Sequence, residues 1–198
     1  MKVLNLYAGI GGNRRNWRGV NVTAVELNPD IADVYGAMYP DDMVIVADAH
    51  EYLRKHYSEF DFIWTSPPCQ SHSSMRQNIG VRFRGVAAEY PDMKLYQEII
   101  FLRYNFTGHF VVENVKPYYE PLIPPTAELH RHLFWSNFSI PAAEFTQSKL
   151  RSVQIPDLQD YLGIDVSKYR IPNKRQILRN CVLPELGEHV FNSAFAPF

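Results

Sequence analysis

The chain of 198 residues has only two cysteines, Cys69 and Cys181, and no apolar run near the roughly 20 residues that span a bilayer. Two cysteines are too few for a disulfide framework or a cysteine zinc site, which favours a reducing, cytoplasmic setting without a structural metal. The N-terminal stretch carries one lysine and reaches glycines within nine residues, too short a run for a signal peptide. The composition therefore argues against a membrane protein and against a disulfide-rich secreted protein.

A strong excess of charge of one sign is also missing. The formal net charge is −1, so the field of the whole molecule does not indicate a nucleic-acid-binding protein. Positive charge is nevertheless uneven along the chain. Residues 146–180 contain seven lysines and arginines against three aspartates, and the segment Gln70–Gly85 adds Arg76, Arg82 and Arg84 without an acid. These clusters are consistent with a nucleic-acid contact or with chance clustering on a surface.

The hydrophobic content of 46% is enough to bury a core, and short apolar runs alternate with helical patterns in the first half of the chain. Five of these runs are expected to be strands: Val3–Tyr7, Val22–Glu26, Met43–Ala47, Phe60–Thr65 and Phe110–Glu113. Helices are expected at about residues 28–38, 48–53 and 92–104, the first two introduced by the cap residues Asn28 and Asp48. This alternation predicts an α/β fold with a mostly parallel sheet and helices on both faces.

Beyond the fifth expected strand the pattern is weaker. Arg131–Ser136 and Phe138–Ile140 are expected to be strand pieces, followed by an irregular basic stretch to about Pro172. Lys174–Phe195 is expected to be helical, with an interruption at Pro184. No internal repeat, low-complexity tract or linker divides the chain.

Residues suited to ligand binding come directly after the expected strands. They are Gly9, Gly11, Glu26, Asp48, the run Pro67–Gln70, Glu113 and Asn114. In parallel sheets of this kind the ligand lies beyond the carboxyl ends of the strands, so one shared site is expected there.

The segment Tyr7–Gly12 is a glycine-rich turn between a strand and an expected helix start. Glycine lets a ligand approach the backbone and a helix N-terminus offers amide donors, although any tight turn favours glycine. Glu26 either holds a ribose diol, as acids at this position do in doubly wound proteins, or is a solvated acid at a strand end. Asp48 either accepts from an adenine amino group or only caps its helix.

The run Thr65–Gln70 is the most specific pattern, because two consecutive prolines fix the backbone before Cys69 and remove two donors. A lone cysteine is more often buried and inert, and Cys181, in an apolar helical stretch, fits that description. Cys69 follows a strand in a polar loop, where a thiolate nucleophile is favoured. Glu113 ends the next strand, so a nucleophile and an acid are expected together beside the glycine-rich turn.

In this order, the segments YAGIGG, VELNP, VADA, SPPCQ and VVENV resemble the cytosine-C5 DNA methyltransferase family over about Val3–Ser136. The segment ILRNCVLPELG is similar to the final motif of that family, with Asn180 and Val182 at its Asn-x-Val. The resemblance implies a Rossmann-like, S-adenosylmethionine-dependent methyltransferase fold and the activity of a DNA (cytosine-5-)-methyltransferase. It also implies DNA as the partner and S-adenosylhomocysteine as a product.

The resemblance further implies a role for each matching residue. The S-adenosylmethionine pocket would contain Tyr7, Gly9, Gly11, Glu26, Leu27, Asp48, Pro67, Leu95, Asn180 and Val182. Cys69 would attack C6 of a cytosine flipped out of the duplex, and Glu113 would contact the ring. Residues of the polar segment that begins after Cys69 are expected to contact the nucleic acid, namely Gln70, Arg76, Arg82 and Arg84.

One motif departs from the family pattern, which is usually Gln-x-Arg-x-Arg before an aromatic strand. Aligned on Phe134, this chain places His130 and His132 on the two arginine positions, with Arg131 between them. The sequence His-Arg followed closely by Phe-Trp is also similar to that of the de novo class of animal enzymes. Arg131 is the expected third catalytic residue, which supports the flipped base. The alternative is that all three are ordinary polar residues at a strand start.

Length suggests the domain organisation. Residues 1–136 are expected to be the catalytic and cofactor-binding core, residues 137–173 a minimal target-recognition segment, and residues 174–198 a helical segment that returns to the core. Only 36 residues, Phe138–Asn173, replace the long recognition region of the family. Short or relaxed sequence preference is therefore expected, unless a second copy or a specificity partner adds DNA surface. Such a compact enzyme suits phage DNA modification or restriction–modification in a bacterial or phage-infected cytoplasm.

Other functions share parts of this pattern. A tRNA cytosine-C5 methyltransferase would share the fold and nucleophile, but the Cys-Phe-Thr signature of its best-known branch is missing. Amino-methyltransferases end their Pro-Pro loop in an aromatic residue, and an NAD-binding protein would carry a third glycine in place of Arg14. Cys69 and Glu113 argue against a catalytically silent DNA-binding relative, while the histidine-rich motif leaves that alternative open.

Overall fold

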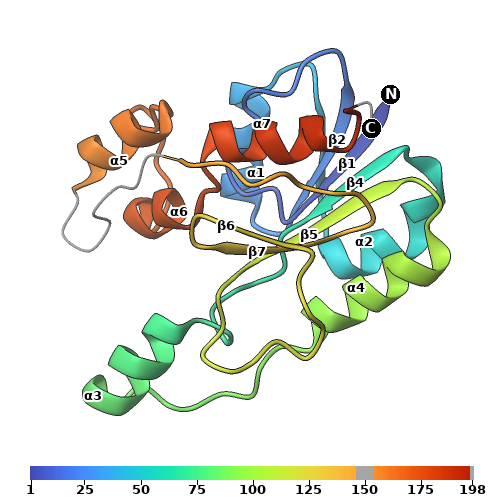
Figure 1. Ribbon diagram of the computed structural model, residues 1–198. Coiled ribbons are helices and arrows are strands. Elements are labelled where there is room, and N and C mark those ends of the chain that lie inside the picture. The colour runs from blue at the N-terminus through green and yellow to red at the C-terminus, as the bar shows by residue number, and fades with distance from the viewer. Residues whose placement is uncertain (146–153, 197–198) are drawn as a thin grey trace.

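A seven-stranded sheet lies at the centre of the computed structural model, which describes residues 1–145 and 154–196 (Figure 1). The strand order is β3-β2-β1-β4-β5-β7-β6. The strands are β1 (Lys2–Leu6), β2 (Asn21–Glu26), β3 (Met43–Val46), β4 (Phe62–Thr65), β5 (His109–Val115), β6 (Ala127–Leu129) and β7 (His132–Ser136). Strands β1 to β5 are parallel, and β7 is antiparallel to both β5 and β6.

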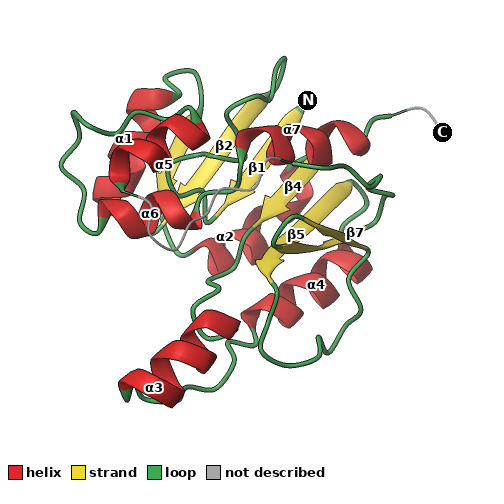
Figure 2. Cartoon of the chain, turned by 60° about the vertical axis from the view of Figure 1, so that its left-hand side comes forward, coloured by secondary structure: helices red, strands yellow, loops and turns green. Residues whose placement is uncertain are grey.

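Helices cover both faces of this sheet, with α2 and α4 on one face and α1 and α7 on the other (Figure 2). The helices are α1 (Pro29–Met38), α2 (Ala49–His56), the 3-10 turn η1 (Tyr57–Glu59), the π-helical turn η2 (Arg76–Val81), α3 (Arg82–Arg84), α4 (Lys94–Asn105), α5 (Ile155–Leu162), α6 (Lys174–Asn180) and α7 (Pro184–Ser193). The mostly parallel sheet between two helical layers confirms the predicted α/β architecture.

Two apolar cores explain why the central strands are continuous hydrophobic runs. Val3 of β1 packs in the core that includes Val34 of α1 and Val190 of α7. The next residue, Leu4, packs in the opposite core with Leu53 of α2 and Leu102 of α4. Because successive side chains of a strand point to opposite faces, a strand covered on both faces favours apolar residues on both sides.

Local start signals in the sequence produce the first two helices as predicted. The Asn28 side chain accepts from the amides of Asp30 and Ile31, at 2.9 and 3.2 Å, and Pro29 takes the first helical position. Asp48 caps α2 by accepting from the Glu51 amide at 3.0 Å. These caps satisfy amides that have no partner inside the helix, which fixes where each helix begins.

Several elements of the second half differ from the prediction. Phe138–Ile140 is not a strand, because the Asn137 side chain bonds to the backbone of Phe110 and Gly108 and so ends the pairing of β7. Within the stretch expected to be irregular, α5 forms, with a capping box at its start and Gly163 in the left-handed conformation at its end. The segment after Cys69, expected to be a loop, is helical over η2 and α3.

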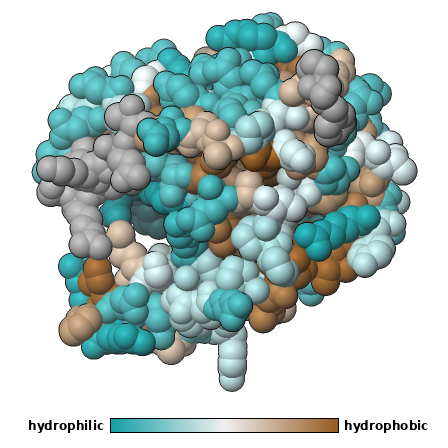
Figure 3. Space-filling view, viewed as in Figure 1, coloured by the Kyte–Doolittle hydropathy of each residue, from teal (hydrophilic) through white to brown (hydrophobic). Residues whose placement is uncertain are grey.

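The carboxyl ends of β1, β2, β4 and β5 meet at one edge of the sheet, where η2 and α3 project from the body (Figure 1). In the space-filling view an open gap separates this projection from the body of the protein (Figure 3). In the described part of the chain, no helix has the length and apolar character that crossing a membrane requires.

Candidate active site

A cavity of about 410 Å³ lies at the carboxyl ends of the parallel strands. It brings together most of the residues that the sequence proposes for one site: Tyr7, Gly9, Glu26, Leu27, Asp48, Pro67, Cys69, Gln70, Glu113, Arg131, Asn180 and Val182. Gly11, Leu95, Arg76, Arg82 and Arg84 do not line it. In the described residues, no group of three or more histidine, cysteine or acidic side chains forms a metal-binding cluster.

The glycine-rich turn and Glu26 form one wall of the cavity. The amide of Gly9 donates to Glu26 Oε2 and the amide of Asn28 donates to Oε1, both at 2.9 Å. A Cβ on Gly9 would meet nothing within 4 Å, so the backbone here is open to a ligand. Leu27 is 66% exposed at the rim. The two amides orient the Glu26 carboxylate, whose remaining lone pairs are available to hydroxyl groups of a ligand.

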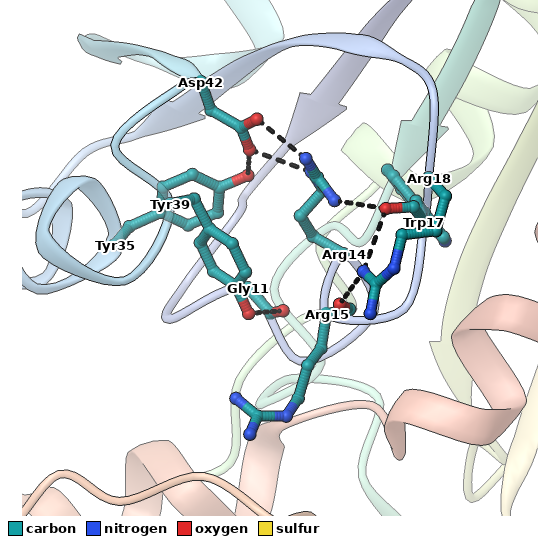
Figure 4. Close-up of polar contacts among 8 residues, drawn as sticks. All are labelled: Gly11, Arg14, Arg15, Trp17, Arg18, Tyr35, Tyr39 and Asp42. Carbon is teal, nitrogen blue, oxygen red and sulfur yellow. Dashed lines mark hydrogen bonds and ion pairs between the residues drawn. The ribbon is translucent and has the colours of Figure 1, made fainter.

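Gly11 has a different role, which Figure 4 shows. A Cβ at this position would lie 2.4 Å from the ring of Tyr39, whose hydroxyl donates to the Gly11 carbonyl at 2.7 Å. Nearby, Arg14 donates two hydrogen bonds of 2.9 Å to Asp42, which also accepts from Tyr35 at 2.8 Å. Gly11, with φ of +75°, therefore allows the turn to pack closely on the aromatic side chains of α1 and its C-cap.

Asp48 and Lys94 lie at the other end of the cavity. Asp48 Oδ1 caps α2, and Oδ2 lies 3.5 Å from Lys94 Nζ. The hydrogen bond from the Glu51 amide, with a smaller contribution from Lys94, holds the pKa of Asp48 below its ordinary value. Asp48 thus caps its helix and also lines the cavity. Nothing in the local sequence indicated that Lys94 would join it there.

A buried carboxylate, Glu98 of α4, contacts residues beside the cavity and was not predicted from the sequence. It accepts from the Tyr7 hydroxyl at 2.6 Å and from Thr65 Oγ1 at 2.5 Å, and lies 2.9 Å from His50 Nδ1. Its hydrogen bond to His50 is the main reason that the pKa of this histidine is raised. Burial, followed by the charge of Glu98, raises the pKa of Tyr7, so this hydroxyl stays a donor. A lone glutamate on the apolar face of α4 was the only signal in the sequence.

The Pro-Pro segment holds Cys69 at the centre of the cavity. Asn114, buried at the end of β5, donates to the Pro67 carbonyl at 2.9 Å. The carbonyl of Cys69 accepts from the amides of His72 and Ser73, at 3.1 and 3.0 Å. Burial raises the pKa of the Cys69 thiol to about 11, and the charge of Glu113 acts in the same direction.

Glu113 contacts His132 rather than Arg131. Pairing of β5 with β7 places Val115 opposite His132, and His132 Nδ1 lies 2.5 Å from Glu113 Oε1. Arg131 Nε donates to His132 Nε2 at 3.2 Å. Burial alone would raise the pKa of Glu113, but the contact with His132, together with Ser66 and Arg131, outweighs burial and lowers it. Arg131 therefore reaches the carboxylate through the imidazole.

The basic residues proposed for nucleic acid lie on the projecting segment. Arg76 forms an ion pair with Glu89 at 2.6 Å, while Arg82 and Arg84 are exposed. Between them Phe83 is 83% exposed. Lys149 and Arg151, part of the other basic cluster, lie outside the described residues.

Similarity to solved structures is low. A mutant of Spodoptera frugiperda DNMT2 has a TM-score of 0.41 and 24% identity, over 58% of this chain and 35% of that one. An Escherichia coli prophage protein assigned as a DNA modification methyltransferase has a TM-score of 0.40 and 20% identity, over 61% of this chain and 33% of that one. The chain thus spans about a third of the length of these proteins.

No curated protein sequence is significantly similar to the chain. A family model described as C-5 cytosine-specific DNA methylase matches residues 1–120, which contain the glycine-rich turn, Glu26, Cys69 and Glu113. The match covers more than half of the chain, which therefore belongs to the family of C-5 cytosine-specific DNA methylases.

Proposed function

We propose that the protein transfers a methyl group from S-adenosylmethionine to C5 of a flipped cytosine in DNA, through a covalent intermediate on Cys69. The observation that carries this proposal is that Cys69 and Glu113 line the same cavity as the glycine-rich turn and Glu26. A nucleophile, an acid and a nucleotide-type pocket then face one space, which is what methyl transfer to an activated ring requires.

The residues around the turn fit the proposed cofactor. Glu26 would accept from the ribose hydroxyls, and Leu27 and Asp48 would contact the adenine ring and its amino group. Asn180 and Val182, which also line the cavity, would complete the pocket. Gly11 and Leu95 do not line the cavity, so we assign both to packing around the pocket. S-adenosylmethionine supplies an electrophilic methyl group when bound.

Attack by Cys69 makes C5 reactive. C5 of cytosine is a poor nucleophile, and addition of the Cys69 thiolate to C6 moves the ring electrons toward N3 and leaves C5 enamine-like. A proton from Glu113 to N3 neutralises the charge that develops there. After C5 has taken the methyl group, the C5 proton passes to water and Cys69 leaves C6 as a thiolate, which restores the C5–C6 double bond. N3 returns its proton to Glu113, from which it can pass back to the Cys69 thiolate.

The resting site already holds the proton that this step needs. The pKa of Cys69 is about 11 and that of Glu113 is lowered, so near neutral pH the pair exists as a thiol and a carboxylate. The attacking form is a thiolate and a carboxylic acid, which contains the same number of protons. One proton must therefore pass from the sulfur to the carboxylate, with no net exchange with solvent.

Covalent trapping on DNA that contains 5-fluorocytosine tests the proposal, because fluorine at C5 blocks the final elimination. We expect an adduct that survives denaturation and that forms only with DNA and S-adenosylmethionine present. Adduct formation on fluorinated tRNA but not on DNA would replace the proposed substrate with RNA. Absence of any adduct would instead support a catalytically silent DNA-binding protein.

The projecting segment is the proposed DNA contact, with Arg76, Arg82 and Arg84 on phosphates and Gln70 near the flipped base. Replacing Arg84 with alanine is expected to weaken DNA binding uniformly across sequences and to reduce the slope of log K against log salt by about one. Arg103→Ala, an exposed change on α4, is the matched control and should leave the slope unchanged. An unaltered slope for Arg84→Ala would remove Arg84 from the interface.

Sequence preference is expected to be short or relaxed. The proposed target-recognition segment, residues 137–173, is short, and Leu158, Leu162 and Val166 within it are buried in the main core and cannot read bases. Each good bidentate base contact supplies about 1–3 kcal/mol of discrimination. Bisulfite sequencing of unmodified genomic DNA treated with protein and cofactor should show methylation at many short motifs. Methylation by the pure monomer at only one motif of about six base pairs or more would contradict this.

A further inference from the structure

Three side chains form a continuous hydrogen-bonded row along the wall of the cavity. Arg131 Nε donates to His132 Nε2 at 3.2 Å, and His132 Nδ1 lies 2.5 Å from Glu113 Oε1. His132 is 3% exposed and Glu113 is 6% exposed, so water does not compete for these contacts. The guanidinium of Arg131, the imidazole of His132 and the carboxylate of Glu113 therefore follow one another in contact.

The chemistry of the row fixes the position of the imidazole proton. Arginine has only donor groups and stays protonated, so His132 Nε2 must be the acceptor and carries no hydrogen. The proton of the neutral ring is then on Nδ1, where it is donated to Glu113.

Arg131 is itself held in place. Its NH2 group donates to the carbonyl of Arg179 at 2.6 Å and reaches that of Cys181 at 3.4 Å, at the junction that follows α6. Turning the guanidinium away from His132 would break these two contacts. Hydrogen bonds from a charged donor are among the stronger ones in proteins. Other titratable or charged groups face the row from the neighbouring elements, namely His130, Cys69, Tyr161 and Arg179. The His130 ring stacks on His132 at 6.2 Å and 18°.

We infer that His132 is a positioning residue whose neutral ring is locked in the Nδ1–H tautomer by Arg131, and that this row commits Oε1 of Glu113 and so orients its carboxylate in the cavity. The inference rests on the proposed function for the role of Glu113.

Nitrogen-15 spectra of histidine-labelled protein test the tautomer directly, with the His132 signals assigned by their loss in His132→Asn. We expect a pyrrole-type Nδ1 and a pyridine-type Nε2 for the neutral His132 ring. An Nε2–H tautomer would overturn the inference.

Two variants extend the test to function. Arg131→Met removes the donor to Nε2, so the Nε2–H tautomer should appear in the nitrogen-15 spectra and the adduct-forming rate should fall. His132→Asn keeps a donor near the position of Nδ1 but cannot ionise, and should retain adduct formation within about tenfold. His132→Leu, which has no donor, should lose about 10²-fold or more. Equal losses for the asparagine and leucine variants would count against the positioning role.

Trapping of the wild type on fluorinated DNA, done on the same preparations, separates the two claims. If the wild type forms the adduct but His132 carries its hydrogen on Nε2, the tautomer inference fails and the proposed function stands. If no adduct forms, the proposed function fails, and the spectra still decide the tautomer.

Discussion

Replacing Cys69 with serine is expected to abolish covalent trapping and methyl transfer, with a loss on the order of 10⁶-fold, as when other covalent nucleophiles are removed. A serine hydroxyl at this position stays protonated at neutral pH and adds poorly to C6. The rate of methyl transfer from labelled S-adenosylmethionine to DNA, together with adduct formation, is the measurement. DNA binding should persist, because Cys69 supplies chemistry and not phosphate contacts.

Cys181→Ala is the matched control for this change. The Cys181 thiol does not line the cavity, and burial raises its pKa to about 12. Only its backbone carbonyl contacts Arg131, and the substitution keeps that group. The control variant should therefore remain active and form the adduct. Full activity of Cys69→Ser would show that Cys69 is not the nucleophile.

Replacing Glu113 with glutamine is expected to reduce the adduct-forming rate by about 10²- to 10⁴-fold near neutral pH and to change its pH dependence. The amide cannot take the thiol proton, so the thiolate must form by losing this proton to solvent. Because the pKa of Cys69 is about 11, the thiolate fraction rises about tenfold for each pH unit below that value. The rate of the variant should rise with the same slope, as single-turnover trapping can measure.

The wild type should behave differently over the same pH range. Thiol plus carboxylate and thiolate plus acid contain equal numbers of protons, so its rate should be flat between the lowered pKa of Glu113 and about 11. Below the Glu113 pKa an extra proton must leave, and above about 11 the proton for N3 is missing, so the rate should fall on both sides. Parallel pH profiles of wild type and Glu113→Gln would rule out proton transfer from Cys69 to Glu113.

Much of the fold could be predicted because its signals are local. The strand positions follow from apolar runs, and Asn28 and Asp48 mark helix starts by satisfying their own amides. The helix α5 was missed because its stability depends on Leu158 and Leu162 packing into a core built from distant strands. Tertiary burial of this kind is not visible in a short window of sequence.

The site was predictable to the extent that strand ends determine it. Parallel strands bring Gly9, Glu26 and Cys69 to one edge whatever their exact register, so their proximity follows from topology. The contact of Glu113 with His132 depends on the register of the antiparallel pair β5 and β7, which sequence does not reveal. Glu98 was missed for a related reason, since its partners come from three separate elements.

The projecting turn η2 and α3 contain no buried side chain. Substitutions there remove no core packing, and changes at such surface positions usually alter stability by no more than about 0.5 kcal/mol. Cys69 and Glu113, in contrast, line the cavity at the ends of the buried strands β4 and β5. The segment proposed to meet the DNA duplex can therefore vary in sequence without loss of packing around the proposed reaction centre, and a designer can randomise the same residues for altered target choice.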